Sequence, residues 1–472
     1  MCFYNERKSS GSNKIVFLTI NWRNDRTFFA VDTVKPPICF PLEWGYLSNG
    51  NYLAYIIDDH YHNRDLEATL KLIWNIRPTV VVVSTSPSYL YWRCPPLNLR
   101  LVFDYINRIK KCIPSTTIIT IGPHGTIDPD WVLSESASDF VFRGEPDGNL
   151  IEYLETSEFV KCDWLSYQNN IKEIAPQKDF ETIGECDYSY LRSRRYQYHA
   201  WGVNSQRSIK NQIRGYSAMV ELSRGCPFEC QYCFRTGFRE KFRKKSLDIF
   251  ENELIQLSQM HVGYVFFIDE TFGLDWRLCN EACKLLYQRG IKFGMQTRPD
   301  ILDPKKLNEL KKLGCIYIEF GLEANEKECN ECLGKFSEFD TAKINVDIAK
   351  KLISTVNINI VDLMNPDYMD NIPKIIQIDN EGNTPPPLIP YPTTIFGEKV
   401  ISKYENLFPD KSKWEVAELV YLYYSFKAGL LDEIDIFHIE SFLDIIGEFL
   451  EFNETTKNPL IPQFNTRFQK LF

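Results

Sequence analysis

The stretch Ser223-Arg224-Gly225-Cys226-Pro227-Phe228-Glu229-Cys230-Gln231-Tyr232-Cys233-Phe234 places three cysteines within eight residues, at the spacing C-x3-C-x2-C. A structural zinc site or a closed iron–sulfur cluster takes four protein ligands. A compact loop with three thiols therefore implies either a distant fourth ligand or a metal position left open to a substrate or cofactor. Glycine relieves backbone crowding and proline stiffens a turn, so Gly225 and Pro227 suit a loop around a bulky inorganic cluster.

This spacing, with an aromatic residue before the third cysteine, resembles the signature of the radical S-adenosylmethionine (radical SAM) enzymes. In that superfamily three thiolates hold three irons of a [4Fe-4S] cluster, and S-adenosylmethionine (SAM) chelates the fourth iron. An electron from the cluster cleaves SAM to a 5′-deoxyadenosyl radical, which abstracts hydrogen from an unactivated position. The resemblance implies that Cys226, Cys230 and Cys233 bind the cluster and that Tyr232 packs beside the adenine of SAM.

Composition limits what the rest of the chain can do. The 472 residues suffice for roughly two or three domains, each with its own core. A net charge of −9 without a long basic run argues against a dedicated nucleic-acid binder. The one basic cluster, Arg239–Lys245, is expected to be a solvated helix start.

Neither a signal peptide nor a membrane span is expected. The residues from Met1 to Lys14 are polar, and no apolar run approaches the length of a bilayer. The cysteines are therefore expected to be reduced thiols of a cytoplasmic protein, where a cluster of thiolates indicates metal binding.

The first third of the chain alternates β-branched runs with helical patterns, which predicts a doubly wound α/β domain. Strands are expected at Ile15–Ile20, Thr79–Ser84, Thr116–Ile121 and Asp139–Phe142, a helix at Leu97–Cys112, and a helix or strand at Tyr52–Ile57. Ligands of such sheets lie beyond the carboxyl ends of the strands. That edge gathers the loops Ser84–Ser88, Gly122–Thr126 and Gly144–Asp147.

Two of these loops carry a second resemblance. Ile121-Gly122-Pro123-His124-Gly125-Thr126, followed by Asp139-Phe140-Val141-Phe142-Arg143-Gly144-Glu145-Pro146-Asp147, resembles the cobalamin-binding domain that precedes the radical domain in many radical SAM enzymes. The glycines would let backbone amides approach the corrin edge and its phosphate-bearing tail. The resemblance implies cobalamin contacts from Ser84, Gly122, His124, Gly125, Thr126, Gly144 and Glu145.

The lower axial ligand of cobalt stays open. The D-x-H-x-x-G box of one group of cobalamin proteins is absent, and Asp58-Asp59-His60-Tyr61-His62-Asn63 lacks its glycine. Water, an unidentified side chain and His124 are the alternatives, although a loop histidine more often hydrogen-bonds to backbone.

After Cys233 the α/β alternation resumes and predicts a partial (β/α) barrel. Strands are expected at Val262–Asp269, Lys292–Arg298 and Ile316–Gly321, and helices at Asp248–Met260, Arg277–Arg289 and Pro304–Leu313. The strand ends Phe-Ile-Asp-Glu-Thr-Phe, Gln-Thr-Arg-Pro-Asp and Glu-Phe-Gly-Leu-Glu resemble those of radical SAM barrels. The resemblance implies that Arg298 pairs with the SAM carboxylate and that Glu323 contacts its ribose or methionine end; a structural ion pair is the alternative for each.

The chain then departs from the pattern. A later strand of such barrels usually ends in a Gly-x-Pro-Gly-Glu-Thr-like turn, where this chain has Val361-Asp362-Leu363-Met364-Asn365-Pro366-Asp367. The proline-rich tract at 385–394 resembles the passage that closes such barrels. We expect a cobalamin-binding Rossmann-like domain at residues 1–155, a connector at 156–215, the radical SAM partial barrel at 216–400 and a C-terminal helical region at 401–472, with helices at Trp414–Leu431 and Ile436–Phe452.

Later cysteines admit two interpretations. Cys315, Cys329 and Cys332 are candidates for a second cluster, but reduced core thiols explain them more simply. Cys279 and Cys283, four residues apart on a helix, are expected to be core thiols.

Together these features predict a cytoplasmic cobalamin-dependent radical SAM enzyme that uses a [4Fe-4S] cluster, SAM and cobalamin. The preferred activity is methyl transfer to an unactivated carbon of a small-molecule or natural-product intermediate, with electrons from a donor such as flavodoxin or ferredoxin and no nucleic-acid or membrane partner. A cobalamin-dependent rearrangement, cyclisation or oxidation without net methyl transfer is the alternative among enzymes. A SAM- or cobalamin-binding sensor with little turnover is the alternative from another class. Fold and cofactors do not specify the substrate.

Overall fold

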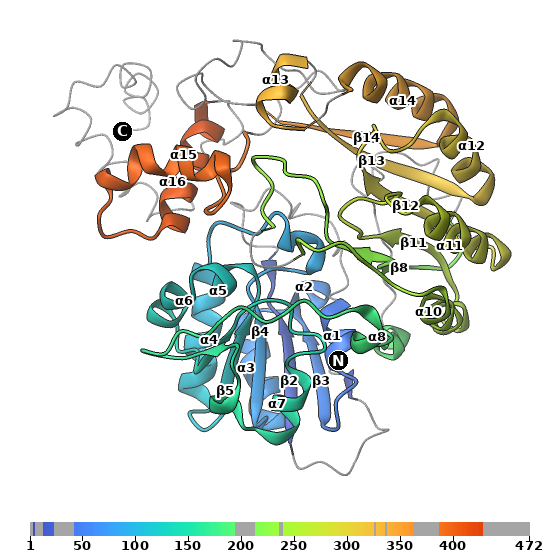
Figure 1. Cartoon of the computed structure of the whole chain (residues 1–472). Helices are drawn as coiled ribbons and strands as arrows, with labels where there is room; N and C mark the ends of the chain where they lie inside the picture. Colours follow the sequence, from blue (N-terminus) through green and yellow to red (C-terminus); the bar gives the residue numbers. More distant parts are fainter. Residues whose placement is uncertain are drawn as a thin grey trace.

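The computed structural model of the chain describes residues 3–4, 13–22, 42–193, 213–235, 239–324, 327–335, 338–361 and 387–427. Figure 1 shows one domain in blue and green, a second in yellow-green to orange, and two C-terminal helices above the first domain. No helix of the described ranges is long and apolar enough to cross a bilayer.

The first domain is built on a seven-stranded sheet of order β1-β3-β2-β4-β5-β6-β7. The strands from β3 to β6 are parallel, while β1 and β7 pair antiparallel at the two edges. Their bounds are Phe3–Tyr4 (β1), Lys14–Thr19 (β2), Leu53–Asp58 (β3), Val80–Ser84 (β4), Thr117–Ile121 (β5), Phe140–Phe142 (β6) and Leu165–Ser166 (β7). The strands predicted for this domain are confirmed. The segment Tyr52–Ile57, for which a helix or a strand was expected, belongs to β3, because its backbone pairs with both β1 and β2. The strand β7 lies within residues 156–215, which were expected to form a connector.

The strand order sets the place of a ligand. Counted along the chain, the parallel strands run 2-1-3-4-5, so the order reverses between β2 and β4. Doubly wound sheets bind ligands in the crevice outside the carboxyl ends at this reversal. The loop that follows β4 lies there.

Helices and turns connect these strands. Side-chain caps fix several starts: the Asp65 carboxylate accepts from Ala68 N–H, and Asp128 accepts from Trp131 N–H. The helices are Leu42–Leu47 (α1), Asp59–His62 (α2), Leu66–Ile76 (α3), Arg100–Cys112 (α4), Pro123–Ile127 (α5), Pro129–Glu135 (α6), Ile151–Thr156 (α7) and Phe180–Ile183 (α8).

The second domain is an open sheet of five parallel strands in the order β14-β13-β12-β11-β8, which confirms the partial barrel. The strands are Tyr216–Val220 (β8), Val262–Phe267 (β11), Lys292–Thr297 (β12), Cys315–Glu323 (β13) and Thr355–Ile360 (β14). The helices are Leu247–Gln259 (α10), Trp276–Gln288 (α11), Pro304–Leu313 (α12), Lys327–Cys332 (α13) and Phe339–Leu352 (α14). In Figure 1, α10, α11, α12 and α14 cover the outer side of the sheet. Its inner side is therefore turned toward the rest of the molecule.

The C-terminal helices α15 (Ile395–Tyr404) and α16 (Lys413–Lys427) join both domains. Trp414 packs 4.4 Å from the ring of His124 in the first domain and 5.6 Å from that of Phe234, just after the third cysteine. The helix predicted from Trp414 is confirmed over its first part. The helix predicted at 436–452, the segment 362–367 and the start of the proline-rich tract lie outside the described residues.

Candidate functional site

The loop with the three cysteines starts at β9 (Ser223–Arg224), which pairs antiparallel with β10 (Arg243–Lys244). Gly225 opens the loop with a left-handed φ of +84°, and a Cβ there would stand 2.2 Å from the carbonyl oxygen of Lys241. Its N–H donates to the Glu270 carboxylate at 2.9 Å. Only glycine fits this position, as the sequence indicated.

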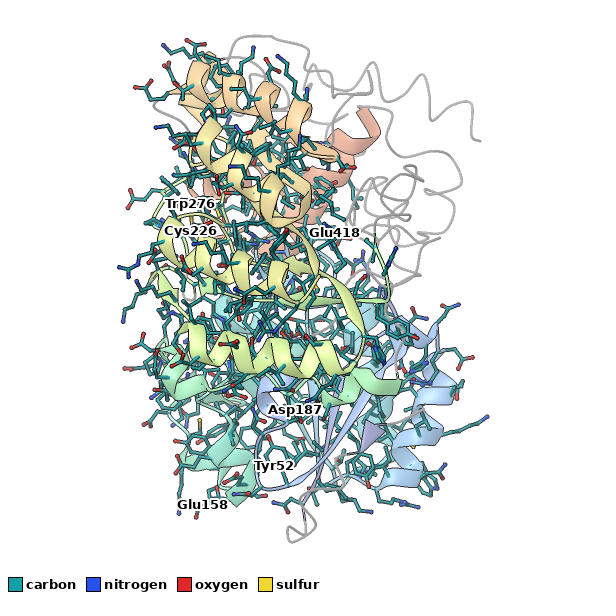
Figure 2. The ribbon with its side chains drawn as sticks, turned by 90° about the vertical axis from the view of Figure 1, so that its right-hand side faces the viewer. Tyr52, Glu158, Asp187, Cys226, Trp276 and Glu418 are labelled. Atoms are coloured by element: carbon teal, nitrogen blue, oxygen red, sulfur yellow. The ribbon has the colours of Figure 1, made fainter. Side chains whose placement is uncertain are left out.

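The three thiols are partly accessible and lie near one another. Cys226 Sγ is 3.4 Å from Thr271 Oγ1, and Cys230 Sγ accepts from Arg298 Nη1 at 3.6 Å. Burial, followed by negative charge on Cys230 and Cys226, raises the pKa of Cys233 to about 12. Three thiolates so close together repel, and positively charged irons between them would remove that repulsion. Figure 2 labels Cys226 at the level of the second domain, well away from Glu158 at the far end of the first.

A cube fits this loop better than a single ion. Within the described ranges, no three His, Cys, Asp or Glu side chains converge on one metal-ion position. A zinc ion needs such convergence, whereas each cysteine of a [4Fe-4S] cube binds a different iron. Three accessible thiols on one short loop therefore match a cube that leaves its fourth iron to another ligand.

Arg298, just after β12, braces this loop. Its guanidinium donates to the Asp300 carboxylate at 2.7 and 3.0 Å and to the Lys335 carbonyl at 2.5 Å, and it lies 3.7 Å over the ring of Phe228. The structural ion pair left open by the sequence is thus present. Contact between Arg298 and the SAM carboxylate stays a prediction.

Two predicted SAM contacts meet beside the cysteines. Glu323, near the end of β13, has a φ of +65°, which non-glycine residues rarely adopt. Its carboxylate accepts from Lys335 Nζ at 3.1 Å, and the same Nζ donates to Tyr232 Oη at 2.9 Å. Backbone strain of this kind concentrates at functional sites. Lys335, which the sequence analysis missed, joins Glu323 to the cysteine loop.

Arg224, immediately before the loop, is fully buried and links the two domains. It donates to Glu221 at 2.8 Å within its own domain. It also donates to Asp147 at 2.5 Å and to Glu145 at 3.2 Å in the first domain. The predicted cobalamin loop at 144–147 thus supplies carboxylates to the domain interface.

Glu145 has a second arginine partner in this network. Arg243 donates to both of its carboxylate oxygens, at 2.5 and 2.8 Å. Burial alone would raise the pKa of Glu145, but Arg224 and Arg243 lower it to about 2. These ion pairs place the Glu145 carboxylate in the interface between the domains, and its contact with cobalamin stays a prediction.

The expectation for the basic cluster at 239–245 is corrected. It is not a solvated helix start, because three of its cations are buried in ion pairs. The pairs are Arg239 with Glu270, Arg243 with Glu145 and Lys245 with Glu253. A charge run gives no sign of burial when its partners lie far away in the chain.

The loop after β4 fits a polar ligand. Ser84 Oγ donates to the Ser86 carbonyl at 2.7 Å. The hydroxyls of Ser86 and Ser88 are buried and lack a hydrogen-bond partner in the described part of the chain. A buried unpaired hydroxyl costs about 1 to 3 kcal/mol. A cofactor with amide or phosphate groups at this edge would satisfy both.

The glycines of the first domain pack closely against other protein atoms, and their contacts with cobalamin stay a prediction. A Cβ at Gly122 would stand 2.3 Å from Thr85 Oγ1, and one at Gly125 would stand 2.3 Å from Val141 Cγ1. A Cβ at Gly144 would lie 3.1 to 3.2 Å from Ala175. Protein atoms, not an open edge, therefore exclude side chains at these positions.

His124 and Thr126 are internal links of the same region. Nε2 of His124 lies 2.6 Å from the Pro96 carbonyl and Nδ1 lies 2.9 Å from Thr85 Oγ1. Burial lowers the pKa of His124 to about 3, so the ring is neutral. Both ring nitrogens of His124 are thus engaged within the protein, and its contact with cobalamin stays a prediction. Thr126 Oγ1 donates to the Gly122 carbonyl at 2.8 Å and accepts from Gly144 N–H at 3.0 Å.

The structure also places the remaining candidates. The segment 58–63 contains the short helix α2, with Asp58 as its N-cap. Cys279, Cys283 and Cys315 are buried core thiols, as expected. Cys329 and Cys332 lie on α13, and their side chains are outside the described residues.

Parts of the chain are similar to known proteins. Residues 220–376 match the family model described as the Radical SAM superfamily. An uncharacterised methyltransferase from Pyrococcus horikoshii is 25% identical over 296 residues, which cover 59% of this chain and 59% of that protein. An anaerobic magnesium-protoporphyrin IX monomethyl ester cyclase from Rubrivivax gelatinosus is 26% identical over 303 residues, which cover 61% of this chain and 52% of that protein. The chain thus spans between half and three fifths of these two relatives.

The fold is similar to that of TsrM from Kitasatospora setae, a radical SAM methyltransferase solved with tryptophan and a SAM analogue. The TM-score is 0.60 at 14% identity, over 84% of this chain and 77% of that one. A structure of TsrM with cobalamin and a [4Fe-4S] cluster bound matches at a TM-score of 0.54 and 14% identity, over 75% of this chain and 70% of that one. The likeness extends over both domains.

Proposed function

We propose that this chain, whose residues 220–376 form a radical SAM domain behind a doubly wound domain, is a cobalamin-dependent radical SAM methyltransferase. It would transfer the methyl group to an unactivated carbon of a small-molecule substrate. The observation that carries the proposal is contact between the carboxyl edges of the two sheets. Arg93, from the loop after β4, donates to Gln296 on β12 at 2.9 Å and to the Asp269 carbonyl after β11 at 3.4 Å. Both folds bind ligands at these edges, so cofactors on the two domains would face each other.

The residues divide into those that bind and those that position. When bound, the cluster supplies the electron that cleaves SAM, and cobalamin supplies a carrier for a methyl group. Cys226, Cys230 and Cys233 would hold the cluster. Glu270 accepts the N–H of Gly225 at the start of the cysteine loop, and Arg298 lies over the ring of Phe228 within it. Both contacts keep the loop in place.

A second group would bind the organic cofactors. Glu323, Lys335 and Tyr232 would hold SAM beside the open iron, because they surround the loop at the end of β13. Ser86 and Ser88 would donate to polar groups of cobalamin. The helix α16, which packs on His124 and Phe234, would limit the access of water to the region between them.

One relative favours a second candidate. The similarity to a cyclase, at the same level of identity as the methyltransferase, supports a cobalamin-dependent cyclisation or rearrangement without net methyl transfer. A SAM- or cobalamin-binding sensor with little turnover is the third candidate.

Electrons would come from a flavodoxin- or ferredoxin-like donor in the cytoplasm. This donor would reach the cluster through the accessible side of the cysteine loop.

Replacing serines in the loop after β4 is expected to change protein stability and cobalamin affinity in opposite directions. Replacing Ser86 and Ser88 together by alanine removes two unpaired buried hydroxyls, so the apo-protein is expected to become more stable by about 1 kcal/mol. Loss of two donors to cobalamin is expected to weaken hydroxocobalamin binding by about tenfold or more. Urea unfolding and equilibrium dialysis measure the two effects.

The matched control is Ser48→Ala, which removes a buried hydroxyl that already donates to the Gly45 carbonyl at 3.1 Å. It is expected to lower the stability of the apo-protein and to leave cobalamin affinity within about threefold of the wild type. If the double variant binds hydroxocobalamin as tightly as the wild type, the corrin does not lie on this loop.

A further inference from the structure

The inner side of the second sheet carries polar side chains on β13 and its neighbours. Phe267 of β11 stacks on Phe250 of α10 with ring centroids 6.0 Å apart, so Phe267 faces the helices that cover the outer side (Figure 1). Successive side chains of a strand point to opposite faces, so Phe266 faces inward. Its ring lies 6.1 Å from that of Tyr317 on β13. Tyr317 therefore marks the inner side of β13, and Glu319, two residues further, points the same way.

Hydrogen bonds and strand register join Glu319 to both neighbouring strands. Its Oε2 accepts from Tyr317 Oη at 2.9 Å, and its Oε1 accepts from Asn359 Nδ2 of β14 at 2.7 Å. On β12, Gln296 is in register with Glu319. Gln296 Oε1 accepts from Arg93 Nη2 at 2.9 Å. Three polar side chains on adjacent strands, Gln296, Glu319 and Asn359, thus form what we call the polar row.

The partners of the polar row determine which of its groups remain for a ligand. Arginine only donates, so Gln296 turns its carbonyl oxygen to Arg93 and keeps its amide N–H bonds for an acceptor. Asn359 donates to Glu319, so its carbonyl oxygen remains an acceptor. Within the described ranges, neither of these remaining groups has a protein partner. Both side chains are partly exposed, so a ligand can reach them.

Glu319 lacks a positive charge of its own. It is 7% exposed, and it makes no ion pair among the described residues. Burial raises its pKa, and hydrogen bonds from Asn359 and Tyr317 and the charge of Arg93 offset this only in part. A buried carboxylate is costly unless a cation accompanies it. Two of its roughly four lone-pair positions are also left without a donor. A cationic ligand with N–H groups would supply both the charge and the donors.

The polar row lies next to the proposed SAM residues. Gly321 follows Glu319 on the same side of β13, and a Cβ at Gly321 would stand 2.7 Å from Glu323 Oε1 and 3.1 Å from Lys335 Nζ. Those two groups therefore lie over the position directly beyond Glu319. Arg93 reaches the row from the loop after β4 of the first domain. A ligand on the polar row thus lies beside the proposed SAM site and within reach of the first domain.

We propose that the polar row binds the substrate through a protonated amine, which donates to Glu319 and to the Asn359 carbonyl oxygen, while a neighbouring oxygen of the substrate accepts from Gln296. The inference rests on the proposed function and names its substrate class, a small molecule with an amine beside a carbonyl or hydroxyl group. A pure hydrocarbon substrate would leave all three side chains without partners, at a cost for each. The polar row positions the substrate and takes no part in the chemistry.

Two small probes of matched size test the charge. Glycinamide carries an ammonium group beside a carbonyl oxygen, and glycolamide carries a hydroxyl group in place of the ammonium. Saturation-transfer NMR titrations of anaerobically reconstituted protein measure the Kd of each probe. Wild-type protein is expected to bind glycinamide about tenfold more tightly than glycolamide, because the ammonium forms a charge-assisted pair in a buried site.

SAM also carries an ammonium group, so the titrations are repeated with SAM present and without reductant. SAM at about ten times its Kd fills most of its own site. The preference for glycinamide is expected to persist, because the polar row lies beside that site. Displacement of glycinamide by SAM would assign the ammonium position to SAM and overturn the inference.

Glu319→Gln keeps the shape of the side chain and removes its charge. This variant is expected to lose the preference, so that both probes bind equally weakly. Glu309→Gln is the matched control, because it removes the same charge from an exposed position on α12, and it is expected to keep the preference. Gln296→Met is expected to weaken both probes about threefold or more, because both contain the carbonyl oxygen that it would bind.

Stability separates a binding role from a structural one. Glu319→Gln is expected to unfold at the same urea concentration as the wild type or at a higher one, since it removes a buried charge that lacks a cation. Clearly weaker resistance to urea would make the carboxylate structural and count against the inference.

Two further results would overturn the inference. They are equal Kd values of the two probes for wild-type protein, and a preference for glycinamide that persists in Glu319→Gln. None of these measurements depends on turnover. Failure of the proposed function would appear instead as absent iron binding or absent SAM cleavage, so the two failures are distinguishable.

Discussion

Replacing Cys226, Cys230 and Cys233 together by alanine is expected to abolish the iron–sulfur cluster and all reductive cleavage of SAM while the protein stays folded. The three thiols are partly accessible, and the loop is held by other groups, among them the Gly225 N–H to Glu270 bond. Wild-type protein reconstituted anaerobically should carry about four irons per chain. Iron analysis, visible absorbance and 5′-deoxyadenosine formation measure the loss.

Cys112→Ala is the control for general effects of thiol removal, because it changes a half-exposed thiol on α4 in the first domain. It should keep full iron content. A triple variant that retains the wild-type absorbance and iron would show that the cluster is not bound by this loop.

Replacing Arg224 by methionine is expected to destabilise the protein by about 3 to 5 kcal/mol, since it leaves the Glu145, Asp147 and Glu221 carboxylates buried with fewer cationic partners. Methionine has a similar length and packs adequately, so lost charge rather than lost volume is measured. Because Arg224 joins the two domains, urea unfolding should also separate into two transitions. Far-UV circular dichroism follows both effects.

Arg108→Met is the matched control, because both side chains of the Arg108–Glu67 pair are exposed and exposed pairs contribute about 1 kcal/mol or less.

The pH dependence of stability gives a second test of the network. The folded pKa of Glu145 is lowered to about 2, so its contribution is complete above the unfolded pKa of about 4.3 and is lost as pH falls toward 2. An Arg224→Met protein as stable as Arg108→Met would contradict the role of the network.

The sequence predicted the elements well because their signals are local. β-branched runs and helical periodicity located β2, β4, β5, β6, β11, β12 and β13 to within a few residues, whereas β1, β7, β8 and β14 were not predicted. The three cysteines lie within eight residues of one another. Only pairing with two neighbours resolved Tyr52–Ile57 as a strand. Proximity in the sequence was enough for the cluster loop.

Sequence reasoning failed where partners lie far apart in the chain. Arg243 and Glu145 are separated by 98 positions, and Arg224 and Asp147 by 77, so nothing local distinguishes them from surface charges. The reason for Gly125 likewise depends on Val141, which approaches it only in the folded domain.

We expect the chain to use SAM in two different ways, for methyl transfer through cobalamin and for radical formation at the cluster. In the test, cluster-loaded protein is incubated with SAM, hydroxocobalamin, a low-potential reductant and extracts that contain candidate substrates. S-adenosylhomocysteine and 5′-deoxyadenosine are then quantified in the same sample. Both products are expected to form, and both are expected to depend on a substrate that gains a labelled methyl group from SAM. Abundant 5′-deoxyadenosine with a product of unchanged mass, and no S-adenosylhomocysteine, would contradict methyl transfer and favour the cyclase-like alternative.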